Sequence, residues 1–203
     1  MFSLVQGFYE ELTYVPEHPV ALLGVEESGK SSILEWLKLY FPSTRRANRV
    51  ERPSSLQKIT STVGLNVAKL RLPNERLLVW DLGGARALRP IWERYIDEAQ
   101  AIIWVVDSTD TERMDESRDA LKKLISRPHL KHSPLLVFAN KQDLENAMDP
   151  VKVSLALDMF SDAENRPQCV QPCSAETGDG LKDGIEWLIK SLGEDAKIEM
   201  RIP

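Results

Sequence analysis

Short apolar runs alternate with helical patterns along most of the chain. Strands are predicted at six such runs, over residues 20–23, 64–72, 76–81, 101–107, 135–140 and 168–173. Three of these runs are rich in Val, Ile and Leu and end in a polar residue, which is typical of buried parallel strands. Helices are predicted over residues 30–39, 114–126, 151–160 and 181–192, the last of them ending at Gly193. The alternation predicts an α/β fold, a single doubly wound domain with helices on both faces of a mostly parallel six-stranded sheet.

Some segments depart from this alternation. Only a turn at Pro73 and Asn74 separates the second predicted strand from the third, so the two are expected to form an antiparallel hairpin at a sheet edge. Residues 1–15 place apolar side chains at helical spacing, which predicts an amphipathic helix ahead of a domain over 16–193. Residues 42–58 are rich in Pro, Ser and Arg and predict a long mobile loop, and residues 194–203 are expected to form a tail.

Composition and charge exclude several classes of protein. Of the 203 residues, 42% are hydrophobic and 28% are charged, which argues against a disordered chain. The longest apolar run, residues 101–106, is too short to cross a bilayer, and no basic residue precedes an apolar block at the start of the chain as in a secretory signal. The net charge of −5 argues against a nucleic-acid binder. Cys169 and Cys173 are predicted to be free thiols, which favours an intracellular protein.

The first predicted strand is followed by a phosphate-binding loop. Residues 24–31 read GVEESGKS and match the pattern GxxxxGK[ST]. Its glycines let successive backbone N–H groups surround a phosphate at the start of a helix. Lys30 is expected to reach the β- and γ-phosphates, and the Ser31 hydroxyl is expected to bind Mg²⁺. The nucleotide-binding residues predicted in this part of the chain are Gly24, Glu26, Glu27, Ser28, Gly29, Lys30, Ser31 and Ser32.

Two later motifs favour guanine as the base. Residues 140–143 read NKQD, and the Asp143 carboxylate can accept from both the ring N–H and the exocyclic amine of guanine, a pair of donors that adenine lacks. Asn140 is expected to brace the neighbouring loops, and Lys141 to lay its stem along the purine. Backbone N–H groups that follow the sixth strand are expected to face the guanine oxygen, at Ser174, Ala175 and Glu176. Both motifs stand at the carboxyl end of a predicted strand, where open α/β sheets bind ligands.

A third motif predicts a response to the γ-phosphate. Residues 81–84 read DLGG, in which Asp81 is expected to hold Mg²⁺ through water and the Gly84 N–H to contact the γ-phosphate. Thr62 can ligate Mg²⁺ only while the γ-phosphate holds the preceding loop closed, so loss of that phosphate releases both segments. The predicted metal ligands are Ser31, Thr62 and Asp81, and the predicted catalytic residues are Lys30, Thr62 and Gly84.

With these motifs in this order, the chain resembles the small GTPases of the Ras superfamily and, within it, the Arf and Arf-like branch. The residues that carry this resemblance read TVGLN at 62–66, WDLGG at 80–84, RPIW at 89–92, VVDS at 105–108 and NKQD at 140–143. The opening MFSLVQGFY is most similar to the Arf-related members that act at the trans-Golgi. The similarity extends from the predicted N-terminal helix to about residue 192.

The resemblance implies a switch that binds GTP and GDP with Mg²⁺, hydrolyses GTP slowly and regulates Golgi and endosomal membrane traffic. It implies an exchange factor, an activating protein, trans-Golgi effectors and a membrane receptor as partners of a monomer that associates reversibly with Golgi membranes from the cytoplasm. The N-terminal helix would touch the membrane surface, with packing on the sheet as the alternative. Leu65, Trp80 and Trp92 match the cluster through which family members bind effectors, and ordinary core packing is the alternative for them.

The chain also departs from the family pattern at four places. Ala85 stands where a glutamine usually orients the attacking water, and Glu27 puts an acid near the phosphates, where it is expected to oppose nucleotide binding. The loop at 42–58 is longer than usual, and Phe2 in place of glycine excludes N-myristoylation. These differences leave a hydrolysis-deficient GTP-binding scaffold open as an alternative. A P-loop small-molecule kinase is a weaker alternative, because the chain has the NKQD motif and no arginine-rich lid segment.

Overall fold

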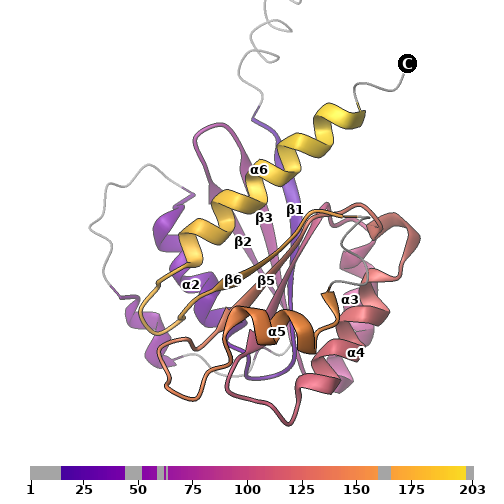
Figure 1. Cartoon of the computed structure of the whole chain (residues 1–203). Coiled ribbons are helices and arrows are strands. Elements are labelled where there is room, and N and C mark those ends of the chain that lie inside the picture. The colour runs from indigo at the N-terminus through magenta and orange to yellow at the C-terminus, as the bar shows by residue number, and fades with distance from the viewer. Residues whose placement is uncertain (1–14, 44–51, 59–61, 63, 160–165, 200–203) are drawn as a thin grey trace, which may run out of the picture.

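Six strands form one sheet in the computed structural model, which describes residues 15–43, 52–58, 62, 64–159 and 166–199. The sheet order is β2-β3-β1-β4-β5-β6, and every neighbouring pair is parallel except the edge pair β2 and β3 (Figure 1). The strands are β1 (Glu17–Leu23), β2 (Leu65–Arg71), β3 (Arg76–Leu82), β4 (Ala101–Asp107), β5 (Leu135–Asn140) and β6 (Gln168–Pro172). The predicted doubly wound sheet with one antiparallel edge hairpin is therefore confirmed.

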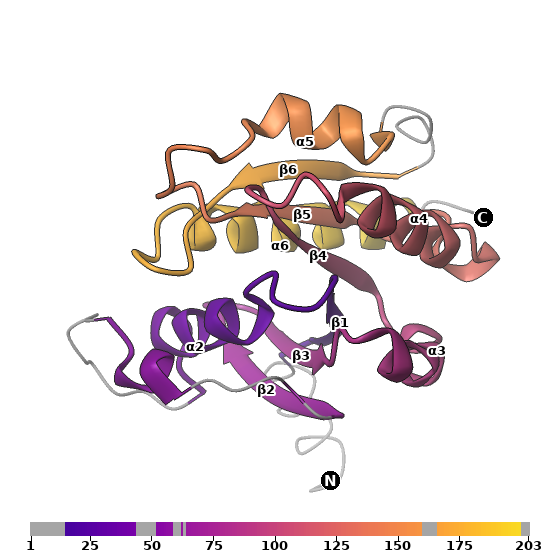
Figure 2. The ribbon, with the colours of Figure 1, turned by 90° about the horizontal axis from the view of Figure 1, so that it is seen from below.

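The helices cover both faces of this sheet (Figure 2). They are α2 (Lys30–Tyr40), α3 (Arg89–Ile96), α4 (Met114–Ile125), α5 (Pro150–Ala156) and α6 (Leu181–Glu199). Helices α2 and α6 pack on one face, and α3, α4 and α5 pack on the other. Short 3-10 turns lie at η1 (Ser54–Lys58), η2 (Arg86–Leu88) and η3 (Pro128–Leu130). Within the described residues, every helix is too short or too polar to cross a lipid bilayer.

The apolar run of β4 explains why both faces of the sheet are covered. Ile103 and Val105 belong to the core beneath α2 and α6, whereas Ile102 and Trp104 belong to the core beneath α3, α4 and α5. Successive side chains of a strand point to opposite faces, so a continuous apolar run needs cover on both sides. The indole nitrogen of the buried Trp104 donates to the Ser117 hydroxyl of α4 at 3.0 Å, which satisfies the one polar group of that side chain.

Several helix boundaries differ from the sequence-based expectations. Helix α6 continues through Gly193 to Glu199, because Gly193 does not take the positive φ that usually ends a helix. Helix α5 begins as expected, with the Asp149 side chain capping the Lys152 N–H at 2.9 Å, but it stops at Ala156. Asp158 follows with a φ of 55°, which ends the helical run. Helix α3 is not among the predicted helices, since it has only eight residues, with a proline as the second, and gives little periodicity.

Two other predicted segments lie wholly or partly outside the described residues. Nothing is described of residues 1–14, where the amphipathic helix is predicted. Of the predicted loop at 42–58, the structure describes residues 42–43 and 52–58, and η1 gives the second of these stretches a regular 3-10 turn. That stretch therefore has a regular turn that its composition did not indicate, and its mobility stays a prediction.

Candidate nucleotide-binding site

The loop between β1 and α2 has the backbone shape that a phosphate requires. Gly24 and Gly29 take φ values of 149° and 96°, which other residues rarely adopt. A Cβ at Gly24 would stand 2.3 Å from the Val105 carbonyl oxygen, and one at Gly29 would stand 2.3 Å from the Asn140 side-chain nitrogen. Both glycines are thus required by conformation and by space, because the loop lies directly against the carboxyl ends of β4 and β5.

Lys30 is folded back into this loop. Its side chain is buried, and Nζ donates to the carbonyl oxygens of Gly24 at 3.1 Å and Val25 at 2.8 Å. Burial lowers the pKa of Lys30 to about 8, and the charges of Asp81 and Glu26 partly oppose that shift. An ammonium group held by two carbonyls inside a phosphate-binding loop is placed to exchange them for phosphate oxygens.

The three predicted metal ligands lie together. The Ser31 hydroxyl donates to Asp81 Oδ2 at 2.7 Å and stands 2.7 Å from the Thr62 hydroxyl. Asp81 is fully buried, and its Oδ1 accepts no hydrogen bond from any described residue. Burial raises the pKa of Asp81, a cost that a bound cation would remove. Two hydroxyls beside a buried carboxylate with an orphaned oxygen fit Mg²⁺, which prefers oxygen ligands and would neutralise phosphate charge here.

Gly84 lies directly against the phosphate loop. A Cβ at this position would stand 2.6 Å from Lys30 Nζ, 2.6 Å from the Gly24 carbonyl oxygen and 2.7 Å from the Glu26 nitrogen. Only glycine permits so close an approach, whatever its φ. The segment after β3 therefore meets the loop after β1 at the place where the predicted γ-phosphate contact belongs.

The base-recognition motifs meet at the same edge of the sheet. Asn140 Nδ2 donates to the Ser28 carbonyl oxygen at 2.8 Å, while its Oδ1 accepts from the Ala175 N–H at 2.9 Å. The Ser174 hydroxyl donates to Asp143 Oδ1 at 2.6 Å and so orients the carboxylate that is expected to read guanine. One buried amide therefore joins the phosphate loop to the loop after β6.

A cavity of about 320 Å³ opens beside these residues. Its lining comes from the phosphate loop and α2, from the loops after β5 and β6, and from residues 52–56: Gly29, Ser32, Arg52, Leu56, Asn140, Lys141, Asp143, Leu144, Ala175 and Glu176. Lys141 has a φ of 67° and pairs with Asp107, which fixes its stem at the cavity. Arg52 and Leu56 were not predicted, and the only signal for Arg52 was the arginine content of residues 42–58.

Ala85, which occupies the predicted water-positioning position, is followed by two arginines that share one carboxylate. Ala85 precedes η2 and offers only a methyl group. Arg86 donates to Glu116 through two nitrogens at 2.9 and 2.7 Å, and Arg89 donates to the same carboxylate at 2.5 Å. The hydrogen bond from Arg86, opposed by desolvation and aided by Arg89, lowers the pKa of Glu116 to about 2. The segment after Gly84 is therefore tied to α4.

Glu27 does not point at the phosphate position. Its side chain is 75% exposed, and its carboxylate lies 3.7 Å from the Arg113 guanidinium. Its φ of 63° is unusual for a residue with a side chain. The acid that the sequence placed near the phosphates thus faces solvent and a cation, which weakens the expected repulsion.

The three predicted effector residues differ in exposure. Trp80 and Trp92 are buried, and the Trp92 indole donates to the Gly83 carbonyl oxygen at 3.0 Å. Leu65 is 36% exposed, and Val67 and Ile91 are further exposed apolar side chains on β2 and α3. The two tryptophans are therefore packed in the core, and Leu65 is the member of this set at the surface, while the effector assignment stays a prediction.

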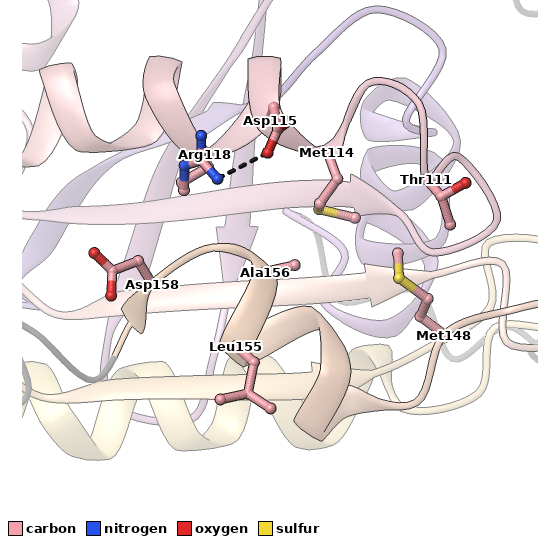
Figure 3. Close-up of a pocket in the computed structure, with 8 residues that line it drawn as sticks. All are labelled: Thr111, Met114, Asp115, Arg118, Met148, Leu155, Ala156 and Asp158. Atoms are coloured by element: carbon pink, nitrogen blue, oxygen red, sulfur yellow. Dashed lines mark hydrogen bonds and ion pairs between the residues drawn. The ribbon is translucent and has the colours of Figure 1, made fainter.

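A separate hollow of about 550 Å³ lies between α4 and α5 (Figure 3). Met114, Met148 and Leu155 supply its apolar lining, and Arg118 pairs with Asp115 along its rim. It contains none of the predicted nucleotide-binding residues, so it lies apart from the site described above.

Comparison with known proteins agrees with this geometry. Residues 9–192 match the ADP-ribosylation factor family. The chain is 38% identical over 193 residues to ADP-ribosylation factor-related protein 1 of Homo sapiens, which covers 95% of this chain and 93% of that protein. It is 36% identical over 192 residues to ADP-ribosylation factor J of Dictyostelium discoideum, with 95% and 90% covered.

A solved structure gives the same answer for the fold. The Arl6 (BBS3) small GTPase of Trypanosoma brucei, bound to the nucleotide analogue GppNp, superposes with a TM-score of 0.73 at 26% identity. The match covers 88% of this chain and 98% of that one. The resemblance drawn from the motifs is therefore confirmed. The chain belongs to the ADP-ribosylation factor family of small GTPases, which are GTP-binding switches that hydrolyse GTP, typically with Mg²⁺, and act through regulators and effectors.

Proposed function

We propose that this protein recruits membrane-traffic effectors to Golgi and endosomal membranes in its GTP form and is reset by slow GTP hydrolysis. The observation that carries the proposal is the convergence of Thr62, Asp81 and Gly84 on the phosphate loop. Thr62 precedes β2 and Gly84 follows β3, so both ends of the edge hairpin are held where a third phosphate would contact them. Removing that phosphate would free both ends together, which is how such switches signal.

The slow reset is supported by the chemistry of Ala85. A methyl group cannot orient the attacking water, and the next two arginines along the chain, Arg86 and Arg89, are both engaged with Glu116. Intrinsic hydrolysis in P-loop GTPases is already slow and rises by several orders of magnitude when a partner supplies an arginine. Reset in this protein therefore depends on an activating protein.

Membrane attachment is assigned to residues 1–15, which lie almost wholly outside the described residues. Their sequence offers apolar positions such as Phe2 and Phe8, whereas Glu10 and Glu11 bring negative charge and no basic residue is present. A short helix of this kind binds anionic lipid weakly. We therefore assign the attachment to apolar contacts and a protein receptor in the Golgi membrane, available when GTP is bound.

Flotation tests this attachment. The GTP-analogue and GDP forms are mixed with anionic liposomes or with Golgi membranes, alongside a double variant, Phe2→Ser with Phe8→Ser. We expect the GTP-analogue form to float with Golgi membranes and the double variant to stay behind. Strong flotation of the GDP form on bare anionic liposomes, unchanged in the double variant, would contradict the proposal.

Nucleotide content and single-turnover hydrolysis test the switch itself. We expect the purified protein to carry guanine nucleotide and to hydrolyse bound GTP slowly alone and faster with cell extract as a source of activating protein. A protein that carries only adenine nucleotide would contradict the proposal and would favour the small-molecule kinase instead.

A second candidate function is a GTP-binding scaffold that does not hydrolyse GTP at a useful rate. Ala85 favours it, because neither the intrinsic nor the stimulated reaction would have its usual water-orienting amide. The same single-turnover assay separates the two candidates. If bound GTP persists unchanged with extract present, the scaffold is the correct assignment.

A further inference from the structure

One wall of the nucleotide cavity comes from a segment that carries no nucleotide-binding motif. Arg52 and Leu56 line the same cavity as Asn140, Lys141 and Asp143, although they precede β2 in the chain. The cavity is therefore bounded on one side by the predicted base-recognition residues and on another by residues 52–56. What holds this second wall in place decides whether a bound base is enclosed or open to solvent.

Arg52 is joined to the loop after β6 by an ion pair. Its Nη2 donates to Glu176 Oε2 at 2.7 Å and lies 2.6 Å from Oε1, so one guanidinium nitrogen engages both carboxylate oxygens. These residues stand 124 positions apart in the sequence, and both line the cavity. The ion pair therefore spans the cavity rim from one wall to the other.

The rest of the segment is anchored on α2. The Ser55 hydroxyl donates to Glu35 Oε2 at 2.8 Å, and Lys38 holds the other oxygen of that carboxylate at 2.6 Å. Leu56 packs against the core beneath α2 and α6, and Figures 1 and 2 both place η1 beside α2. Glu35 and Lys38 lie beyond the first turn of α2, so these contacts hold the segment against the body of that helix. The segment is thus held by α2 through Ser55 and by the loop after β6 through Arg52.

We propose that residues 52–58 form a clasp over the guanine cavity, closed by the Arg52–Glu176 ion pair, and that this clasp retards nucleotide release. Leu56 supplies an apolar wall for the purine, and Arg52 closes the mouth. The clasp acts on the base side, because Arg52 and Leu56 line the cavity beside the predicted base-recognition residues, and neither Thr62 nor Gly84 lines it. Its described contacts are to α2 and to the loop after β6 and include neither Thr62 nor Gly84, so it should retard GDP and GTP release by the same factor. This inference rests on the guanine-nucleotide site described above.

The size of the effect follows from exposure. The side chains of Arg52 and Glu176 are 50% and 57% exposed, so their attraction is screened by water and salt. An exposed ion pair of this kind changes an equilibrium constant by about fivefold at most. We expect release to quicken about two- to fivefold when the pair is broken at low salt, and by less at high salt.

The test measures release of fluorescently labelled GDP from the full chain, in excess Mg²⁺ and unlabelled GDP, at low and high salt. The variants are Arg52→Gln, Glu176→Gln, Arg52→Glu and the charge-swapped double variant Arg52→Glu with Glu176→Arg. Arg118→Gln is the matched control, because Arg118 is a partly exposed arginine that pairs with Asp115 and Asp119 on α4, away from the cavity.

We expect faster release from all three single variants, a rate near that of the original protein for the charge-swapped variant, and no change for the control. A labelled non-hydrolysable GTP analogue should give the same factors. Release at the original rate from both glutamine variants at low salt would overturn the clasp, as would a charge-swapped variant no slower than Arg52→Glu. Neither result would contradict the guanine-nucleotide site itself. Failure of that site would be seen earlier, as an unaltered chain that does not bind guanine nucleotide.

Discussion

Asn140 donates to the Ser28 carbonyl oxygen at 2.8 Å and thereby ties the base-recognition loop to the phosphate loop. Its other side-chain atom, Oδ1, accepts from the Ala175 N–H at 2.9 Å, and the whole side chain is buried. Three segments that are remote in sequence, at residues 28, 140 and 175, are thus positioned by a single amide. Nucleotide affinity should depend on Asn140 even though its main hydrogen bonds are to the protein.

Replacing this amide should loosen both loops at once. We expect Asn140→Ala to weaken GDP binding by about 2–4 kcal/mol, because two hydrogen bonds are lost and buried backbone groups are left unpaired. Isothermal titration of nucleotide-free protein with GDP measures this directly. Gln142→Ala is the control, since Gln142 donates to the Met148 carbonyl oxygen and does not line the cavity. Equal affinities for the two variants would contradict the bridging role.

Guanine specificity should depend on Asp143. Asp143→Asn replaces an acceptor with a group that is partly a donor, at a position where Ser174 fixes the side chain at 2.6 Å. We expect a loss of about 2–4 kcal/mol in GTP affinity and a gain in preference for xanthine nucleotides, whose altered edge offers an acceptor. Competition binding with GTP and xanthosine triphosphate tests this, and unchanged GTP binding would disprove the base-site assignment.

Most of the fold and much of the site could be predicted because their signals are local in sequence. The strands are continuous apolar runs, and the loop around Lys30, the turn near Asp81 and the residues after Asn140 each form a compact motif at a strand end. Parallel strands bring those ends to one edge, so the motifs meet without further information. Their conjunction in the structure follows from topology.

The missed features depend on contacts between remote residues or on individual backbone angles. Nothing near Arg52 indicates that Glu176 will face it, because the pairing depends on where the loop after β6 lies. The length of α6 depends on the φ of Gly193. A glycine in the sequence does not show whether it will end a helix or lie within one. The orientation of Glu27 was likewise set by the loop conformation and by Arg113 on another segment.

The outward position of Glu27 changes what its replacement should do. Sequence alone suggested that an acid here opposes nucleotide binding, but the carboxylate is solvent-exposed and faces Arg113. We expect Glu27→Asn to leave nucleotide release nearly unchanged at any salt concentration. It should raise the free energy of unfolding by about 0.5–1 kcal/mol, because asparagine tolerates the positive φ better than glutamate. Denaturant unfolding and release kinetics check both parts, and salt-dependent slowing of release would restore the original expectation.

The Glu116 cluster should make stability depend on acidic pH. The hydrogen bond from Arg86, together with Arg89, lowers the pKa of Glu116 from 4.5 to about 2 in the folded protein. A depressed pKa stabilises the fold above about pH 4.5, and this contribution is lost as the pH falls towards 2. We expect Glu116→Gln to have a lower thermal midpoint than the unaltered chain at pH 6, with the difference shrinking at pH 3. A difference that stays constant over this range would show that the charge of Glu116 is not what stabilises the fold.

Ala85 should limit the rate at which the switch is reset. It follows Gly84, which lies against Lys30 and the phosphate loop, so a longer side chain at position 85 would begin next to the γ-phosphate position. A glutamine amide there could orient the attacking water, whereas the methyl group of alanine cannot. We therefore expect Ala85→Gln to raise GTP turnover stimulated by an activating protein by about tenfold or more, equivalent to about 1.4 kcal/mol of barrier.

Ala85→Ser is the control, because its hydroxyl adds polarity without the reach of an amide. Single-turnover hydrolysis with and without cell extract measures the change. Equal rates for the unaltered chain and the glutamine variant would mean that another residue positions the water, and Ala85 would then say nothing about the lifetime of the GTP-bound state.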